Sequence, residues 1–470
     1  MKAKQNILFP VEGINRELDF RLFLACMFAS KNNRIFIGQH NIIERLFQYM
    51  EGGFYLGKNI FREGIFPFVN PRNYIELKKR NFTLIHLDEE GIPFTSEFEN
   101  IWYKQLNLQL NANYLAEEDY ICTWGDYQRD FYRSRQPACK QNIRTTGHPR
   151  FDLYKPKYRT FFKDTADQHR QKYGEFVLIN TNLQISNNGL GLADTFSDHY
   201  NYDPSDAQGR LDYISLWTYL NHILSNIIKL VTRLSVEFPS INFVVRPHPG
   251  EDGSFYRTVF RGVENVHVVH EGPVASWLQA CRLLIHDGCT TGIEGVLGGT
   301  PVLNYKSNPS EKYDVFVPNN VGVKCFTEEE VIGHVKAVFS GNERDKYIEE
   351  TAHKPIVAQM MANFKQDSFQ CLLDVMTEAE DKVNRSRISP SWNKSKFQLK
   401  EMMNLAVNSA KDKVRPFYRS KYRAYLFYKA QFYGFNNEVV RSKFDLIQQI
   451  TQKNIRWQMY NDSLIIVESD

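Results

Sequence analysis

The sequence predicts an α/β protein of two Rossmann-like domains, followed by a helical and basic C-terminal extension. Short apolar runs that end in polar loops alternate with helical segments through most of residues 5–345, which is typical of doubly wound α/β domains. The 470 residues also exceed the size of a usual single core. We place the domains at residues 1–165 and 166–345 and the extension at residues 346–470.

The first domain begins with a short strand, a helix and a second strand, and each later strand ends in a polar loop. We expect strands at residues 6–9, 34–38, 82–87, 120–123 and 143–146, with a helix at 18–29. A charged helical connector at 157–175 then leads to the second domain.

The second domain repeats this rhythm. We expect strands at residues 176–180, 242–246, 266–269, 283–286 and 301–305, and helices at 216–238 and 274–280. Residues 184–213 are polar and rich in Gly, Asn and Asp, which predicts a long surface loop. Residues 328–380 are expected to be helical, and helices are expected to continue through the tail.

The composition fits a globular protein of the cytoplasm. Hydrophobic residues make up 42% and charged residues 24% of the chain. No run of 18 apolar residues is present, and the apolar run after the N-terminus is too short for a signal peptide. The seven cysteines are scattered and lack C-x-x-C spacing, which favours reduced thiols over disulfides or a structural zinc site.

Positive charge is concentrated near the C-terminus. Residues 381–460 hold 17 Lys or Arg against 5 Asp or Glu, a net +12, so the remainder of the +4 chain carries −8. The stretch 415–423, R-P-F-Y-R-S-K-Y-R, mixes cations with aromatic residues. Such a segment contacts an anionic membrane or a polyanionic acceptor, or it packs as a solvated helical face on acidic neighbours. No nucleic-acid-binding motif accompanies it.

Two strand ends in the second domain predict a phosphate-bearing ligand, most simply a nucleotide. Arg246 and His248 follow one strand, and Arg suits phosphate or carboxylate while His can protonate a leaving phosphate. After a second strand, a Gly-rich turn leads into a helix start, where backbone N–H groups favour anions. This turn and helix start supply five further candidates: Asp287, Gly288, Thr290, Thr291 and Glu294, the last for a ribose hydroxyl or base edge. Without a ligand, the same residues would form an ordinary helix cap.

Three consecutive acids in the first domain are candidates for catalysis. Asp88, Glu89 and Glu90 follow a predicted strand, and crowded carboxylates raise one another's pKa. Such a group can act as a general base or a nucleophile, with Glu89 and Glu90 preferred. A solvated acidic turn is the alternative.

Other polar residues at strand ends are candidates for binding an acceptor or a sugar. Each has a structural alternative, such as an i,i+4 ion pair between Glu12 and Arg16 or packing of Trp124. The set is Glu12, Arg16, Glu17, Trp124, His148, Arg150, Asn180 and Asn182.

Seven motifs in this order resemble the bacterial "surface carbohydrate biosynthesis protein" family. They are P-V-E at 10–12, R-E-L-D at 16–19, L-D-E-E-G at 87–91, T-G-H-P-R-F-D at 146–152, I-N-T-N at 179–182, R-P-H-P at 246–249 and H-D-G-C-T-T-G-I-E at 286–294. The resemblance covers about residues 5–340 and leaves the basic tail outside.

The resemblance implies a GT-B-like architecture, with two domains facing a cleft, related to transferases that move Kdo and similar ulosonic acids from CMP-sugars into capsule or lipopolysaccharide. It implies a cytoplasmic, metal-independent glycosyltransferase at the inner face of the membrane. Its partners would be a nucleotide sugar and a glycan or glycolipid acceptor, without a cofactor or nucleic acid. Two alternatives remain: an epimerase of the UDP-GlcNAc type, and a non-catalytic assembly protein that binds glycan or membrane.

Overall fold

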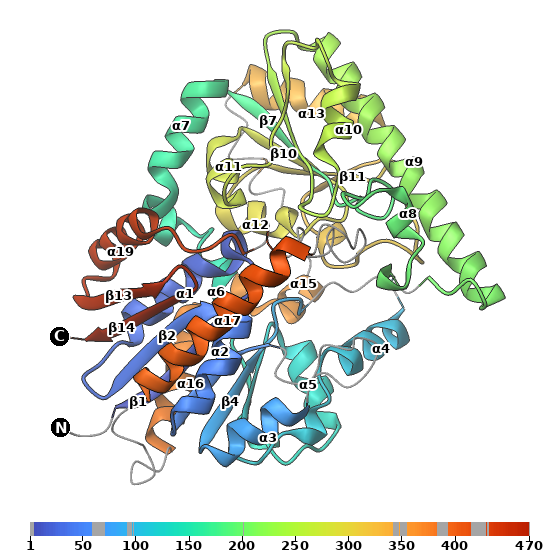
Figure 1. Ribbon diagram of the computed structural model, residues 1–470. Coiled ribbons are helices and arrows are strands. Elements are labelled where there is room, and N and C mark those ends of the chain that lie inside the picture. The colour runs from blue at the N-terminus through green and yellow to red at the C-terminus, as the bar shows by residue number, and fades with distance from the viewer. Residues whose placement is uncertain are drawn as a thin grey trace. The chain divides into compact units, whose positions relative to one another are not determined.

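The computed structural model describes residues 4–58, 71–91, 96, 98–200, 202–341, 347, 355–382, 393–414, 429 and 432–469 (Figure 1). The chain divides into two compact units. Unit 1 comprises residues 1–91, 103–152 and 359–470, and unit 2 comprises residues 92–102 and 153–358. Each unit has its own largely or wholly parallel sheet with helices packed on it, so the predicted α/β class with two parallel-sheet domains is confirmed.

Unit 1 contains an eight-stranded sheet in the order β13-β14-β2-β1-β3-β4-β5-β6. The strands β1 to β6 are parallel to their neighbours within this group. They are β1 (Gln5–Val11), β2 (Asn33–Gln39), β3 (Gly53–Gly57), β4 (Phe82–Leu87), β5 (Tyr120–Thr123) and β6 (Ile143–Thr145). Strand β3 is absent from the sequence prediction, because glycines interrupt its short apolar core. The structure requires one of them, Gly53, since a Cβ there would lie 1.8 Å from the carbonyl oxygen of Asn6.

The helices of unit 1 come from both ends of the chain. From the N-terminal part come α1 (Ile14–Phe28), α2 (His40–Leu46), α3 (Pro71–Lys79), α4 (Glu99–Gln109), which begins in unit 2, α5 (Asp126–Ser134) and α6 (Pro149–Asp152). From the C-terminal part come α15 (Pro355–Met360), which begins in unit 2, α16 (Ser368–Lys382), α17 (Lys394–Val414) and α19 (Asn437–Thr451).

The last residues of the chain form strands, so the prediction of a wholly helical extension is wrong for residues 455–469. Strands β13 (Ile455–Asn461) and β14 (Leu464–Ser469) form an antiparallel hairpin, and β14 pairs antiparallel with β2. Figure 1 shows this red hairpin beside the blue strands of the N-terminal part. The physical reason is the apolar, β-branched run Leu464-Ile465-Ile466-Val467, which is buried against the edge of the sheet.

Unit 2 contains a six-stranded parallel sheet in the order β12-β11-β10-β7-β8-β9. Its strands are β7 (Phe176–Asn180), β8 (Asn242–Arg246), β9 (Val266–Val268), β10 (Leu283–His286), β11 (Val302–Tyr305) and β12 (Val323–Cys325), of which only β12 lacks a sequence prediction. Its helices are α7 (Lys163–Tyr173), α8 (Leu192–Thr195), α9 (Ala207–Glu237), α10 (Gly253–Val259), α11 (Val274–Ala280), α12 (Thr291–Gly298) and α13 (Glu328–Ser340). The predicted loop 184–213 therefore also contains α8 and the start of α9.

The sheet of unit 2 has an apolar layer on each face. Alternate residues such as Ile179 and Val245 face a core shared with α9, α10 and α13. Leu178, Val244 and Leu284 face a second core shared with α7 and α11, against which α12 packs. Because side chains alternate along a strand, the residues two positions after Leu178, Val244 and Leu284 lie on the same face of the sheet as the second core.

Candidate functional site

Four adjacent strands of unit 2 end in one row of polar residues. The strand register pairs Asn180 with both Arg246 and His286, and it pairs His286 with Asn304. The positions two residues earlier, including Leu178, Val244 and Leu284, are apolar and buried. On the sheet face that carries α11 and α12, the side chains thus change from apolar to polar at the carboxyl ends of the strands. This is the edge where parallel α/β sheets bind ligands.

Several polar atoms of this row are buried and have no hydrogen-bond partner among the described residues. They are Oδ1 of Asn180, Nε of Arg246, both ring nitrogens of His286 and both amide atoms of Asn304. Buried polar groups are normally hydrogen-bonded, and each orphan costs about 1–3 kcal/mol. An uncommon concentration of them at one edge of the sheet indicates a place for a polar ligand.

Helix α12 lies against this row through a glycine. A Cβ on Gly292 would lie 2.3 Å from Nε2 of His286, so only glycine allows this approach. Burial, helped by the charge of Lys306, lowers the pKa of His286 to about 3, so the ring is neutral at physiological pH. The helix begins at Thr291, and the amides of Gly292, Ile293 and Glu294 donate to the carbonyls of Cys289 and Thr290.

The loop after β8 is held by a buried carboxylate that the sequence analysis does not single out. Oε1 of Glu251 accepts hydrogen bonds from the amides of His248 (3.1 Å) and Leu183 (3.0 Å) and from the hydroxyl of Thr181 (2.7 Å). Burial raises the pKa of Glu251. Its position three residues after His248 is visible in the sequence, but only the fold shows that it joins the loops after β7 and β8.

The imidazole of His248 has a defined tautomer. Its Nδ1 accepts a hydrogen bond from the amide of Gly250 at 3.1 Å, so the neutral ring carries its proton on Nε2. Arg246 donates from Nη2 to the carbonyl of Gly272 at 2.6 Å. The loop therefore holds one guanidinium group and one neutral imidazole in fixed positions.

The remaining candidates of the second predicted cluster have different roles. Asp287 is engaged by Lys306 at 2.7 Å, and Lys306 also contacts Asp314 at 2.9 Å, so Asp287 belongs to a buried ion-pair network. Gly288 has a φ of +61°, and its amide donates to Asn319 at 3.0 Å. These residues shape the turn. Thr290, Thr291 and Glu294 lie at the start of α12, where Thr290 is half-buried and the other two are buried. Asn182 lies in the loop after β7 and is half-buried.

In unit 1, the predicted residues gather around Glu89. Its carboxylate has no exposed surface and lies 3.2 Å from Arg21, 3.1 Å from Nε2 of His148 and 3.7 Å from Arg150. Burial alone would raise the pKa of Glu89, but its contacts with His148, Arg21 and Arg150 hold it well below the usual value. Burial lowers the pKa of His148, and its Nδ1 accepts the amide of Arg150 at 3.1 Å. His148 is thus a neutral ring whose Nε2–H faces Glu89.

The other acids of this cluster differ in exposure and pKa. Glu17 is buried, and burial together with the charge of Glu89 raises its pKa. Glu90 is 41% exposed and pairs with Arg16. Burial would raise its pKa, but the charges of Arg16, Arg150 and Lys58 together lower it. Glu12 is exposed and pairs with Lys58 at 2.6 Å. The i,i+4 pair between Glu12 and Arg16, which is the structural alternative for these residues, is therefore replaced by two other pairs.

Two candidates in unit 1, Asp88 and Trp124, make contacts that stabilise the local fold. Oδ1 of Asp88 accepts the amide of Glu90 at 3.0 Å and caps the turn. Trp124 is 1% exposed, donates from Nε1 to the carbonyl of Asp88 at 2.7 Å, and packs against His148. Since its ring is enclosed, the structure favours the packing alternative for Trp124 over stacking on a sugar. Arg21 and Lys58, which line the same cluster, lie outside the predicted set; Arg21 is one helical turn after Glu17, a signal that could have identified it.

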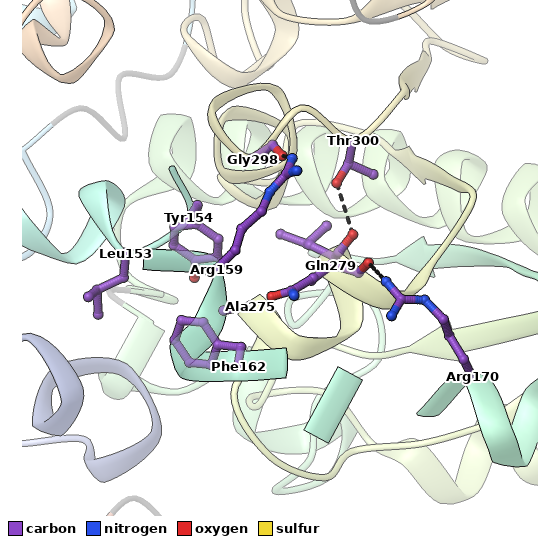
Figure 2. A pocket seen from close by; sticks show the side chains of 10 residues that line it. Leu153, Tyr154, Arg159, Phe162, Arg170, Ala275, Gln279, Gly298 and Thr300 are labelled. Atoms are coloured by element: carbon purple, nitrogen blue, oxygen red, sulfur yellow. Dashed lines mark hydrogen bonds between the residues drawn. The ribbon is translucent and has the colours of Figure 1, made fainter. Parts of the chain in front are cut away.

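A pocket of about 180 Å³ in unit 2 lies beside the C-terminal ends of α11 and α12 (Figure 2). Arg159 donates to the carbonyl of Gly298, and Arg170 donates to the carbonyl of Gln279. The two guanidinium groups therefore neutralise carbonyls at helix ends, a structural role. None of the predicted ligand-binding residues lines this pocket.

Within the described ranges, no group of three or more His, Cys, Asp or Glu side chains is arranged to hold a metal ion. No helix in that same part of the chain has the length and apolar character needed to cross a bilayer. The basic aromatic stretch 415–423 lies outside the described residues.

Comparison with known proteins gives structural likeness without sequence similarity. No family model matches the chain, and no curated protein matches it. The family resemblance of the sequence motifs therefore stays a prediction.

Solved structures that resemble the chain include two kinds of protein. The wall teichoic acid polymerase TagF is 12% identical, covers 82% of this chain and 91% of its own, and has a TM-score of 0.46. The UDP-GlcNAc 2-epimerase from Neisseria meningitidis, bound to UDP-GlcNAc, is 11% identical over 80% of this chain and 100% of its own, with a TM-score of 0.47. MnaA of S. aureus with UDP is 10% identical over 81% and 97%, with a TM-score of 0.49. At these identities and scores, the likenesses define no activity for this chain.

Proposed function

We propose that the chain is a glycosyltransferase that binds a nucleotide sugar at the polar row of unit 2 and a glycan or glycolipid acceptor at the charged cluster of unit 1. One observation carries the proposal: Asn180, Arg246, His286 and Asn304 form a row with buried, unpartnered polar atoms at the ligand-binding edge of a parallel sheet. The ordered sequence motifs support the choice of a sugar nucleotide as the ligand.

The donor class that we propose is a CMP-linked ulosonic acid such as Kdo. This donor carries a carboxylate beside the anomeric carbon as well as a phosphate. Arg246 offers a planar fork for one of these anions, while His248 suits the other. The Asn–His–Asn part of the row is neutral, which suits the hydroxyl groups of a sugar or ribose.

In the proposed reaction, the acceptor hydroxyl oxygen forms a bond to the anomeric carbon and the bond from that carbon to the phosphate oxygen breaks. The hydroxyl proton passes to a carboxylate of unit 1, and the bonding electrons leave with the nucleotide. His248 donates a hydrogen bond from Nε2 to the departing phosphate. Positioned donors of this kind stabilise the charge that develops on the leaving group.

Glu90 is our candidate for the carboxylate that takes the proton. Of Asp88, Glu89 and Glu90, it has the exposed side chain, whereas Glu89 is enclosed by three cationic or imidazole groups. Glu89 then acts as a positioning residue for Arg21, His148 and Arg150. Glu17 is the second candidate, because its raised pKa suits a base that works near neutral pH.

A thermal-shift panel of CMP, UDP, GDP and their sugars tests the donor class. Stabilisation by CMP compounds alone supports the ulosonate donor, whereas stabilisation by UDP compounds alone refutes it. Conversion of UDP-GlcNAc to an epimer without any acceptor would establish the epimerase alternative. Absence of any nucleotide effect would favour a non-catalytic assembly protein.

Variants separate binding from turnover. His248→Ala and Thr291→Ala are expected to abolish the nucleotide shift. Glu90→Ala should keep that shift and lose sugar transfer, measured by chromatography of products formed from donor and acceptor. Normal transfer by the Glu90 variant would refute its role, and a parallel Glu17→Gln variant shows whether Glu17 takes the proton instead.

A further inference from the structure

Helix α17 exposes a group of apolar residues that departs from the usual amphipathic pattern. A surface helix normally turns its apolar residues inward and its charges outward. In α17, Leu399, Met402, Met403 and Val407 are 63%, 68%, 56% and 52% exposed. A charged residue of the same helix, Glu401, is buried instead.

The inward face of α17 is firmly attached to unit 1. Phe397 is fully buried, with its ring 5.7 Å from that of Tyr49 and 5.8 Å from that of Tyr460. Glu401 accepts two hydrogen bonds from Arg45, at 2.7 and 2.8 Å. This paired geometry fixes the rotation of the helix about its axis, so the exposure of the apolar residues does not follow from a loosely held segment.

The exposed residues form one continuous stripe. At 3.6 residues per turn, positions 399, 402, 403 and 407 fall within an arc of about 140° whose centre lies opposite Phe397 and Glu401. Lys394, Lys396 and Lys400 of the same helix are also exposed. By the same spacing, Lys396 and Lys400 lie at one border of the stripe, near Val407, whereas Lys394 lies on the side of Phe397 and Glu401. The outward face of α17 (orange in Figure 1) is therefore apolar, with positive charge at one border.

We propose that α17 docks unit 1 onto the surface of an anionic lipid membrane. An interfacial helix inserts Leu and Met side chains among the acyl chains at the headgroup boundary, while lysines contact anionic headgroups. The charge at the stripe's border selects this occupant over a second copy of the chain, because pairing two α17 helices would bring lysines of like charge together. The proposal is independent of the nucleotide site and of the transferase reaction.

Co-sedimentation of the full chain with vesicles tests this docking. The protein should bind vesicles that contain about one third phosphatidylglycerol in phosphatidylcholine and should show at least tenfold weaker binding to pure phosphatidylcholine. The double variant Met402→Asp/Met403→Asp should lower the affinity for the anionic vesicles at least tenfold. Lys396→Glu/Lys400→Glu should lower it and also reduce its dependence on salt.

Two matched controls carry the same chemical changes elsewhere. Val236→Asp alters a residue of α9 that is 77% exposed, and Lys336→Glu alters an exposed lysine of α13; both should bind vesicles like the unchanged protein. Circular dichroism and thermal unfolding should show that the α17 variants are folded, since all four altered side chains are exposed.

Three results would overturn the proposal. One is unchanged vesicle binding by both α17 variants, which would move membrane contact to another part of the chain. The second is no binding of the unchanged protein to anionic vesicles. The third is a dimer in analytical ultracentrifugation that the Met402→Asp/Met403→Asp variant abolishes, since a second copy would then cover the stripe.

Discussion

Two histidines show how one local sequence acquires different roles from its surroundings. In both His148-Pro149-Arg150 and His248-Pro249-Gly250, the Nδ1 atom accepts the amide two residues later, so the neutral ring has its proton on Nε2. In unit 1 that nitrogen faces the carboxylate of Glu89 in a closed network. In unit 2, His248 is half-buried and follows Arg246 of the polar row, and we propose that it contacts the nucleotide there. The motif therefore determines the tautomer, and the tertiary structure determines what surrounds the Nε2–H group.

The proton on Nε2 of His248 gives the first prediction. His248→Ala should weaken nucleotide binding about 10- to 100-fold, because a hydrogen bond to a charged group contributes about 1.5–3 kcal/mol. His248→Asn should have the same effect on binding, although its side-chain oxygen can still accept the amide of Gly250 and keep the loop. Isothermal titration calorimetry measures both. Restoration of full affinity by Asn would show that His248 only shapes the loop.

A second prediction concerns the opposite pKa shifts of two buried glutamates in unit 1. The pKa of Glu89 is held far below its usual value, so its charge stabilises the fold above about pH 4.3 and this contribution is lost as the pH falls through the folded-state pKa. Glu89→Gln should therefore cost about 3–5 kcal/mol at pH 7, as expected when one partner of a buried ion pair is removed.

Glu17 should behave in the opposite sense. Its pKa is raised, so the folded chain holds this proton more tightly than the unfolded chain, and the contribution to stability is lost as the pH rises through the folded-state pKa. Glu17→Gln should be neutral or stabilising at pH 7, and this benefit should shrink at pH 5. Urea unfolding at both pH values measures the difference, with the exposed Glu264→Gln as control. A large loss for Glu17→Gln at pH 7 would contradict the assignment.

At the scale of elements, close packing of α12 on the sheet positions the candidate ligand site. Gly292 lets the helix approach His286, and Gly295 does the same against Val302 and Leu284. Both glycines lie within an eight-residue helix, where they lower intrinsic helix stability. Their presence shows that the distance between the helix start and the strand ends matters more in this fold than helix propensity.

Gly292→Ala should therefore be destabilising. Its Cβ would lie 2.3 Å from Nε2 of His286, and overpacking of this kind costs about 1–3 kcal/mol. It should also weaken nucleotide binding, because the imidazole in the row must move. Gly333→Ala in α13 has no atom within 4 Å of the new Cβ and should instead stabilise the protein by up to about 1 kcal/mol. Thermal unfolding of the pair compares the two, and equal effects would exclude the packing argument.

The elements that sequence patterns predict well are those with a strong local signal. The strands β4, β7, β8 and β10 are continuous apolar runs with clear polar ends, and their predicted bounds match the structure. Strands β3 and β12 are short and lack such a run, so local pattern does not distinguish them from loops. The C-terminal hairpin is a different case: the apolar run at 464–467 is clear in the sequence, but the prediction of a helical tail extends over it.

At the scale of the whole molecule, the two ends of the chain form one unit. The last 15 residues of the described chain contribute the hairpin that pairs with β2, and α19 is attached to α1 by an ion pair between Lys443 and Asp19. Helix α16 packs against α6. Asn363, which precedes α16 in the chain, donates to the carbonyl of His148 at 3.0 Å. The C-terminal part therefore helps to build the unit that holds the acidic cluster.

This arrangement predicts that damage to the hairpin destabilises unit 1. Ile465 is fully buried opposite Ile37 of β2, so Ile465→Ala should cost about 2–5 kcal/mol. Gln458→Ala, at an exposed position of β13, should change stability by less than about 0.5 kcal/mol. Urea unfolding followed by tryptophan fluorescence measures both. If Ile465→Ala leaves unfolding unchanged, the hairpin is an appendage and not part of the core.

The sequence by itself determined the α/β class, the alternation of strands and helices, and the polar residues at the ends of β4, β7, β8 and β10. Local periodicity and strand-end chemistry depend on residues close together in the chain, so they are visible without the fold. The tertiary structure decided the rest: the row that joins Asn180, Arg246, His286 and Asn304, the enclosure of Glu89 and Trp124, and the return of the C-terminus to β2. These features depend on strand order and burial, which join residues far apart in sequence.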